Sequence, residues 1–261
     1  MLLKALGPFV NVGQSMHLIA LGSVFLLAMA VHAEAQAPSR TILDGVYSEE
    51  QAARGKIAYT RACASCHGDA LEGVAGPSLT DTRFMDRWRE GALDLLFNFM
   101  KERMPPGRGG TLSDKEYLDV LTYILRVNNY RTGPSELDAA MLINVMFVGK
   151  NGPQPVPDGA LIVTVGCIAE ESDGRIVLAR ATEPVRTRMG AGSTPAELKL
   201  SSEKTLGTLT FRLSDLEAVP DFMPAAHKGH KLHAKGYLVR QPNAERINLS
   251  SIEMLDSSCG P

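Results

Sequence analysis

Two cysteines and a histidine lie within five consecutive residues, Cys63-Ala64-Ser65-Cys66-His67. Two thiols at this spacing, placed at the end of a helix, can both bond to one edge of a flat organic group, and the histidine that follows can present its imidazole to the same face. The same cysteine pair could instead form a redox disulfide or half of a zinc site. A redox pair is expected near a βαβ pattern, and a zinc site needs further ligands, but no other cysteine lies in the first half of the chain. The pattern therefore favours covalent attachment of one c-type haem, with His67 as proximal iron ligand.

A six-coordinate haem iron needs a second axial ligand from the opposite face. Met104 is the best candidate, because it precedes Pro105 in the segment MPPGRGG, which cannot be helical and can cover the far face of the haem. Met85 and Met100 are the competing methionines. Both lie among apolar residues, where packing in the core is the expected role.

The N-terminus resembles an export signal. The stretch from Met16 to Val31 is largely apolar and is followed by the small-residue run HAEAQA. We expect residues 1–35 to be a signal peptide cleaved near Ala33 or Ala35, because about 16 apolar residues are short against the roughly 20 that a membrane helix needs. An uncleaved anchor is the alternative. Export predicts a bacterial periplasmic location with no stable membrane span after cleavage, and bacterial c-type haem is attached in that compartment.

The elements that position these residues are predicted to be helices and loops. Helices are expected from Ser48 to Cys63, around Trp88, from Ala92, and after Ser113. Gln51 follows Ser48 by three residues and Glu116 follows Ser113 by three, and both pairs have the capping-box pattern. The first half is therefore expected to be all α, with a domain over residues 40–133.

The second half is rich in short β-type runs after a Gly- and Pro-rich segment. We expect residues 134–160 to be a linker and residues 161–261 to form a small all-β antiparallel barrel, OB-like in strand count. The expected strands are 161–168, 175–182, 207–215, 231–240 and 245–255, with SDG at 172–174 as a hairpin turn and a helical turn at PAELK.

From Ser48 to Asn129 the chain resembles class I cytochrome c, through CASCHG, AGPSL, the MPPG loop and LSDKEYLDVLTYIL in that order. The resemblance implies that Cys63 and Cys66 hold the haem, while His67 and Met104 ligate its iron. It also implies that the Pro77 carbonyl accepts a hydrogen bond from the proximal imidazole.

The same resemblance implies that Gly55, Tyr59 and Tyr123 pack at a crossing of the first and last helices. The chain departs from the family in an Arg-rich insert around residues 81–89. There, Trp88 and Arg83 could donate to the haem carboxylates, although a packed indole and a solvated arginine are the more ordinary roles.

The second half resembles the OB-like extension of some bacterial single-haem cytochromes, an extension with no activity known to us. Cys167 and Cys259 are expected to pair, because leftover cysteines in an exported protein usually do, with two separate buried thiols as the alternative. The histidines in H-x-x-H-x-x-H, His227, His230 and His233, are expected to form a solvated loop rather than a metal site.

Overall charge is close to balance, with a formal net charge of -2, and no catalytic triad, phosphate loop or nucleic-acid funnel stands out. With His67 and Met104 both bound, the iron would have no open position for a substrate, so we expect an electron carrier rather than an enzyme. Its partners would be redox proteins, such as a periplasmic dehydrogenase or a terminal oxidase, and not nucleic acid. The alternatives are a haem sensor or peroxidase with a labile methionine, and the haem subunit of a quinoprotein dehydrogenase complex.

Overall fold

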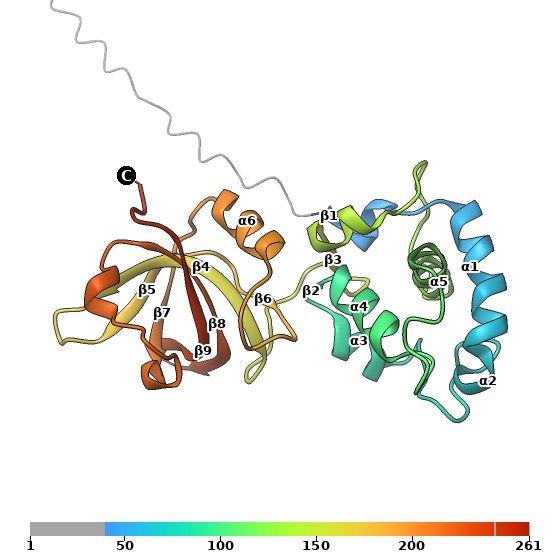
Figure 1. The fold of residues 1–261 in the computed structure, drawn as a ribbon, viewed down its shortest axis with the longest axis horizontal. Helices are drawn as coiled ribbons and strands as arrows, with labels where there is room; N and C mark the ends of the chain where they lie inside the picture. Colours follow the sequence, from blue (N-terminus) through green and yellow to red (C-terminus); the bar gives the residue numbers. More distant parts are fainter. Residues whose placement is uncertain (1–39, 243, 261) are drawn as a thin grey trace, which may run out of the picture. The chain divides into compact units, whose positions relative to one another are not determined.

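A computed structural model describes residues 40–242 and 244–260, so the expected signal peptide lies outside the described residues. The helices are α1 (Glu49–Ala62), α2 (Ala64–His67), α3 (Thr82–Trp88), α4 (Leu93–Arg103), α5 (Asp114–Val127) and α6 (Pro195–Glu203) (Figure 1). Within the described ranges, none of the helices has both the length and the apolar character needed to cross a bilayer.

Of the two expected capping boxes, the one at α5 is complete and the one at α1 is only half formed. Ser113 and Glu116 make the complete reciprocal box at the start of α5. At α1, the Ser48 hydroxyl accepts from the Gln51 backbone N–H, as expected, but the Gln51 side chain does not return the bond. Its amide instead pairs with both backbone groups of Leu137, at 2.8 Å each. The expected bond from the Gln51 side chain back to Ser48 was therefore wrong, because the buried Gln51 amide bonds instead to the backbone N–H and C=O of Leu137.

Helices α1 and α5 cross at Gly55. A Cβ atom at this position would lie 1.8 Å from the Asp119 carbonyl oxygen, so only glycine permits the approach. One turn further along α1, the Tyr59 ring meets the Tyr123 ring at a centroid distance of 5.3 Å. This is the crossing that the cytochrome resemblance implied.

The second half is a large β-sheet region. Its strands are β4 (Leu161–Glu170), β5 (Ile176–Ala181), β6 (Val185–Arg186), β7 (Leu209–Ser214), β8 (Lys231–Gln241) and β9 (Ala244–Asp256). The pairings run β4–β5–β7–β9–β8 and return to β4. All are antiparallel except β7–β9, which is parallel. The expectation of a wholly antiparallel arrangement was therefore wrong at one pair, because a cycle of five strands cannot alternate direction all the way round.

Three further short strands join the same sheet, in the order β1-β3-β2-β6-β4: β1 (Arg40–Thr41), β2 (Gly91–Ala92) and β3 (Val145–Phe147). Strand β3 falls inside the segment expected as a linker. Strand β2 pairs with β6 through Gly91 and Arg186, so the helical part and the sheet region share a backbone ladder. Each part has its own apolar core.

Cys167 and Cys259 form a disulfide with their Cα atoms 6.0 Å apart, which joins β4 to the segment after β9. The bond closes a loop of more than ninety residues, since the sequence separation is 92. A closure of this length restricts the unfolded chain strongly and stabilises the sheet region.

The three histidines of the H-x-x-H-x-x-H segment separate into two environments. His227 and His230 lie near each other with their Nδ1 atoms 3.3 Å apart, ahead of β8. His233 lies inside β8, is buried, and contacts the hydroxyls of Ser193 and Ser201. The described residues show no group of three or more His, Cys, Asp or Glu side chains arranged for a metal ion.

Candidate functional site

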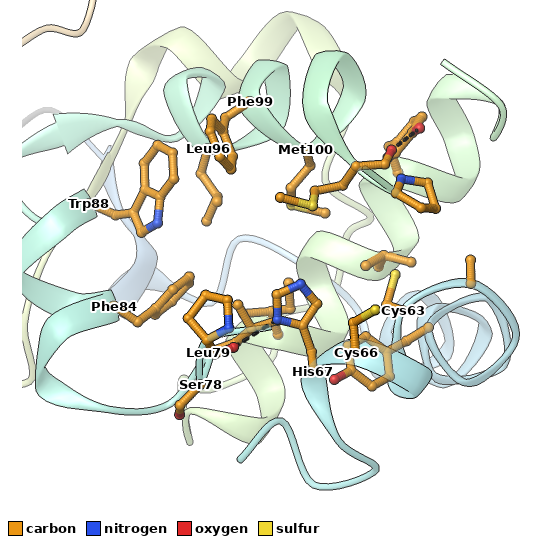
Figure 2. A pocket seen from close by; sticks show the side chains of 18 of the residues that line it. Cys63, Cys66, His67, Ser78, Leu79, Phe84, Trp88, Leu96, Phe99 and Met100 are labelled. Carbon is orange, nitrogen blue, oxygen red and sulfur yellow. Dashed lines mark hydrogen bonds between the residues drawn. The ribbon is translucent and has the colours of Figure 1, made fainter. Parts of the chain in front are cut away.

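A cavity of about 270 Å³ lies inside the helical part, and all four residues singled out as haem-binding line it. Figure 2 shows Cys63, Cys66 and His67 along one side, Met100 across the space, and Trp88 at the end away from the cysteines. The remaining walls are mostly apolar, including Pro77, Leu79, Phe84, Leu96, Phe99, Leu112, Val120 and Ile124.

Helix α1 and the single turn of α2 place the cysteines and the histidine together. The Cys63 N–H donates to the Tyr59 carbonyl and ends α1, and the next turn brings Cys66 and His67 to the cavity. Gly68 then leaves the helix at a φ of 81°, a conformation that favours glycine. The Tyr59 hydroxyl donates to the Gly68 carbonyl at 2.7 Å and fixes this exit.

The His67 imidazole is held in one orientation. Its Nδ1 lies 2.8 Å from the Pro77 carbonyl oxygen, which can only accept, so Nδ1 carries the proton and Nε2 keeps its lone pair. Gly76 leaves room for the ring, because a Cβ there would lie 3.0 Å from His67 Cε1. The Cys66 carbonyl accepts from the Val74 and Gly76 N–H groups and holds the loop in place.

Burial makes the Cys63 thiol a poor nucleophile. Burial, and to a smaller degree the neighbouring Cys66, raises the pKa of the Cys63 thiol to about 11. Redox cysteines in this kind of motif have a lowered pKa that favours the thiolate. The structure also leaves both cysteines without a disulfide. Both observations favour the haem interpretation over a redox disulfide.

Met104 lies directly after α4, where its N–H caps the helix by donating to the Met100 carbonyl. The Tyr117 hydroxyl on α5 donates to the Met104 carbonyl at 2.7 Å and accepts from the Gly110 N–H at 3.1 Å. The loop is thus tied at both ends by a single side chain. No role in the site was predicted for Tyr117 from the sequence. Its hydroxyl, close to an exposed loop, was the signal that could have identified it.

The other methionines divide between the cavity and the core. Met100 is buried and lines the same cavity as Met104, and Figure 2 shows Met100 across the space from His67. Met85 packs against the apolar core of the helical part and is not among the residues that line the cavity.

The end of the cavity away from the cysteines is aromatic and basic. Trp88 is a packed indole, 5% exposed, and lines the cavity together with Arg83 and Arg87. Arg83 is exposed to solvent. Trp88 and Arg83 thus have the packed and exposed states expected of their ordinary roles, and both border the cavity, as does Arg87, which was not singled out from the sequence.

These residues fit a haem by the chemistry of their donor atoms. Two thiols one helical turn apart border one end, and an imidazole with a free Nε2 and two thioethers, those of Met100 and Met104, border the same mostly apolar space. Apolar walls suit the macrocycle, and guanidinium groups at the opposite end suit its carboxylates.

Comparisons with known proteins agree with this assignment for part of the chain. Residues 50–124 match the family model for subunit III of cbb3-type cytochrome c oxidase, and this stretch contains Cys63, Cys66, His67 and Met104. A cytochrome c domain is typical of haem-based electron transfer. No curated protein matches the chain.

One solved structure shows a weak likeness, cytochrome cL from the marine methylotrophic bacterium Methylophaga aminisulfidivorans. It is 19% identical over 35% of this chain and 71% of its own, with a TM-score of 0.24. At that TM-score, the likeness supports no conclusion about this fold.

Proposed function

We propose that this protein is a single-electron carrier with one c-type haem, attached through Cys63 and Cys66 and ligated by His67 and Met104. The observation that carries the proposal is the orientation of His67. Its Nδ1–H is bound to the Pro77 carbonyl at 2.8 Å, which leaves Nε2 for iron in a cavity that Met104 also borders. A packing role in the core would explain a buried histidine, but it would not explain two free thiols and a thioether that line the same cavity.

The bound haem would supply the one-electron Fe(II)/Fe(III) couple. His67 and Met104 would fill both axial positions, which leaves no position for a substrate, and the apolar walls exclude water. A methionine ligand favours the reduced state relative to a second histidine. The hydrogen bond from His67 to Pro77 increases the basicity of the imidazole and fixes its ring.

The first test is covalent attachment. Protein made in a host that attaches c-type haem should retain haem after denaturing electrophoresis, and the variant with both Cys63→Ala and Cys66→Ala should not. Haem lost from the wild-type protein on denaturation would contradict the attachment.

The second test identifies the axial thioether. Met104→Leu and Met100→Leu are matched variants of two methionines bordering one cavity, and both nearly conserve volume. Ferric wild type and Met100→Leu should show the weak red sulfur-to-iron absorption band, and Met104→Leu should lack it. The opposite pattern would assign the ligand to Met100. Ready binding of carbon monoxide by the ferrous wild-type protein would instead favour a sensor or peroxidase with a labile methionine.

We also infer that the cycle of pairings β4–β5–β7–β9–β8–β4 closes a small barrel with OB-type strand order. We propose an exported, periplasmic location, with redox proteins such as a dehydrogenase or a terminal oxidase as partners. The near balance of charge predicts weak electrostatic steering, so association with a partner should depend only modestly on salt.

A further inference from the structure

The sheet region contributes positive charge beside the proposed haem cavity. A second cavity of about 380 Å³ is lined by residues of both parts, among them Arg87 from α3 and Arg186 and Arg188 from the sheet region. Arg87 and Trp88 line this second cavity and the first one as well. Trp88 therefore lies between the two spaces as a shared wall residue, and Figure 2 shows it at the end of the first cavity away from the cysteines.

Two arginines hold Trp88. The Arg188 guanidinium carbon lies 4.8 Å from the centroid of the indole, and that of Arg87 lies 5.4 Å from it. Arg87 also lies 4.9 Å from the Phe99 ring, which borders the first cavity. Cation–π contacts of this kind fix the indole while leaving the N–H groups at the guanidinium edges free to bind an anion.

The segment that carries Arg188 is fixed to the helical part by backbone bonds. The Arg186 N–H donates to the Glu90 carbonyl at 2.7 Å, and its guanidinium donates to the Asp86 carbonyl at 2.5 Å. Arg186 also pairs with Gly91 in the β2–β6 ladder. Arg188 is thus placed by the same strand that connects the two parts.

The positive charges in this cluster are not fully compensated. Burial lowers the pKa of Arg188, and the charges of Arg87 and Arg186 lower it further. Burial also lowers the pKa of Arg186, where Asp86 and Glu90 act in the opposite direction. Among the ion pairs of the described residues, none involves Arg87 or Arg188. Arg87 and Arg188 are both solvent-exposed, so the edges of their guanidinium groups are accessible to an anion beside Trp88.

We propose that Arg188 of the sheet region, together with Arg87, supplies positive charge at the Trp88 end of the proposed haem cavity, where the haem carboxylates would lie, and that this charge raises the reduction potential. The inference rests on the proposed function. Attachment at Cys63 and Cys66 fixes one edge of the macrocycle, and the carboxylates of haem lie on the opposite edge, so they point toward the end of the cavity with Trp88. Arg188 lines the second cavity rather than the first. It is therefore a positioning residue, which acts through its charge and through Trp88.

The reduction potential tests this role, because a nearby positive charge favours the reduced, less positive haem. We compare Arg188→Gln, which removes the charge, with Arg188→Lys, which keeps it. The control is Arg175→Gln. Arg175 lies in the β4–β5 turn, and its ion pairs are to Glu171 and Asp173 of the same turn. Both Gln variants change net charge equally, so an effect of net charge alone would appear in both.

The midpoint potential should fall in Arg188→Gln, stay close to wild type in Arg188→Lys, and remain unchanged in Arg175→Gln. Equal shifts in Arg188→Gln and Arg188→Lys would indicate a packing role only and overturn the inference, as would no shift in Arg188→Gln. The red absorption band and covalent haem, checked in every variant, separate the two proposals. If wild type holds no covalent haem, the proposed function itself fails, whereas intact haem with an unchanged potential contradicts only the role of Arg188.

A free carboxylate could occupy the same cluster. Succinate added at constant ionic strength distinguishes this source from the haem. If the haem carboxylates fill the site, the wild-type potential should not change as succinate is added. A succinate-dependent fall in wild type that is absent from Arg188→Gln would show a site for free anions and overturn the assignment to haem.

Discussion

A methyl group at Gly55 is expected to force α1 and α5 apart. The added Cβ would lie 1.8 Å from the Asp119 carbonyl oxygen, 2.5 Å from the carbonyl carbon and 3.0 Å from Tyr123 Cβ. Two of these three neighbours are backbone atoms, which no side-chain rotation can move. The helices must therefore separate by about 1 Å or more, since overpacking is relieved only by movement of the backbone.

The Gly55→Ala change has a stabilising effect as well as a destabilising one. Overpacking of this kind costs about 1–3 kcal/mol, and alanine is better than glycine inside a helix by about 1 kcal/mol. Separating the helices also strains the ion pair between Arg54, next to Gly55 on α1, and Asp119 on α5, in which Arg54 Nε lies 3.1 Å from a carboxylate oxygen. We therefore expect Gly55→Ala to lose about 1–3 kcal/mol of unfolding free energy, toward the upper end because the clash is with backbone.

Chemical denaturation followed by circular dichroism measures this loss. The control is Gly192→Ala, because a Cβ at Gly192 meets nothing within 4 Å and its φ lies outside the left-handed region. Its stability should stay within about 0.5 kcal/mol of wild type. If Gly55→Ala were as stable as wild type, the close crossing of α1 and α5 would be refuted.

Two further variants test a buried charge and the methionine loop. Burial, with the charge of Glu197, raises the pKa of Asp94 to about 6, so the folded protein keeps a proton that the unfolded chain releases. Below about pH 4, the free energy of unfolding of Asp94→Asn should equal that of wild type, and by pH 6 it should exceed the wild-type value by up to about 3 kcal/mol. Urea denaturation at a series of pH values measures this difference. A more stable variant already at pH 4 would contradict the prediction. Tyr117→Phe removes the hydrogen bonds to Met104 and Gly110 and should lower the free energy of unfolding by about 1–3 kcal/mol. The red absorption band of this variant should also fade at a lower temperature than in wild type. A band that fades at the wild-type temperature would contradict the anchoring role.

The long elements of this fold could be predicted because each carries its own local pattern. The runs around Val163 and Val177 are β-branched and bounded by turn residues, and both became strands of the large sheet. Strands β2 and β6 could not be predicted, because each has two residues and forms only by pairing with a distant segment. Two residues are too few to show a hydrophobic period.

Some residues of the candidate site could likewise be predicted from a local pattern, and others could not. Cys63, Cys66 and His67 are recognisable from spacing alone, because the chemistry requires them within a single turn. Tyr117 was missed, since the role of its hydroxyl depends on how the loop just before α5 folds back onto the helix. Arg188 was also missed, because it meets Trp88 across a sequence separation that no local pattern spans.

The β2–β6 ladder bears on why a sheet region accompanies the proposed haem cavity. Glu90 precedes β2 in a left-handed conformation, with a φ of 63°, and its carbonyl accepts the Arg186 N–H. This turn directly follows α3, whose last residue, Trp88, lines the cavity. A module joined only by a flexible linker would leave the cavity unaffected by changes within it. Here the strand that carries Arg186 leads to Arg188, which contacts Trp88. A displacement of β6 must therefore move a wall of the cavity or break the ladder, so binding of a partner to the sheet region near β6 is expected to change the haem potential.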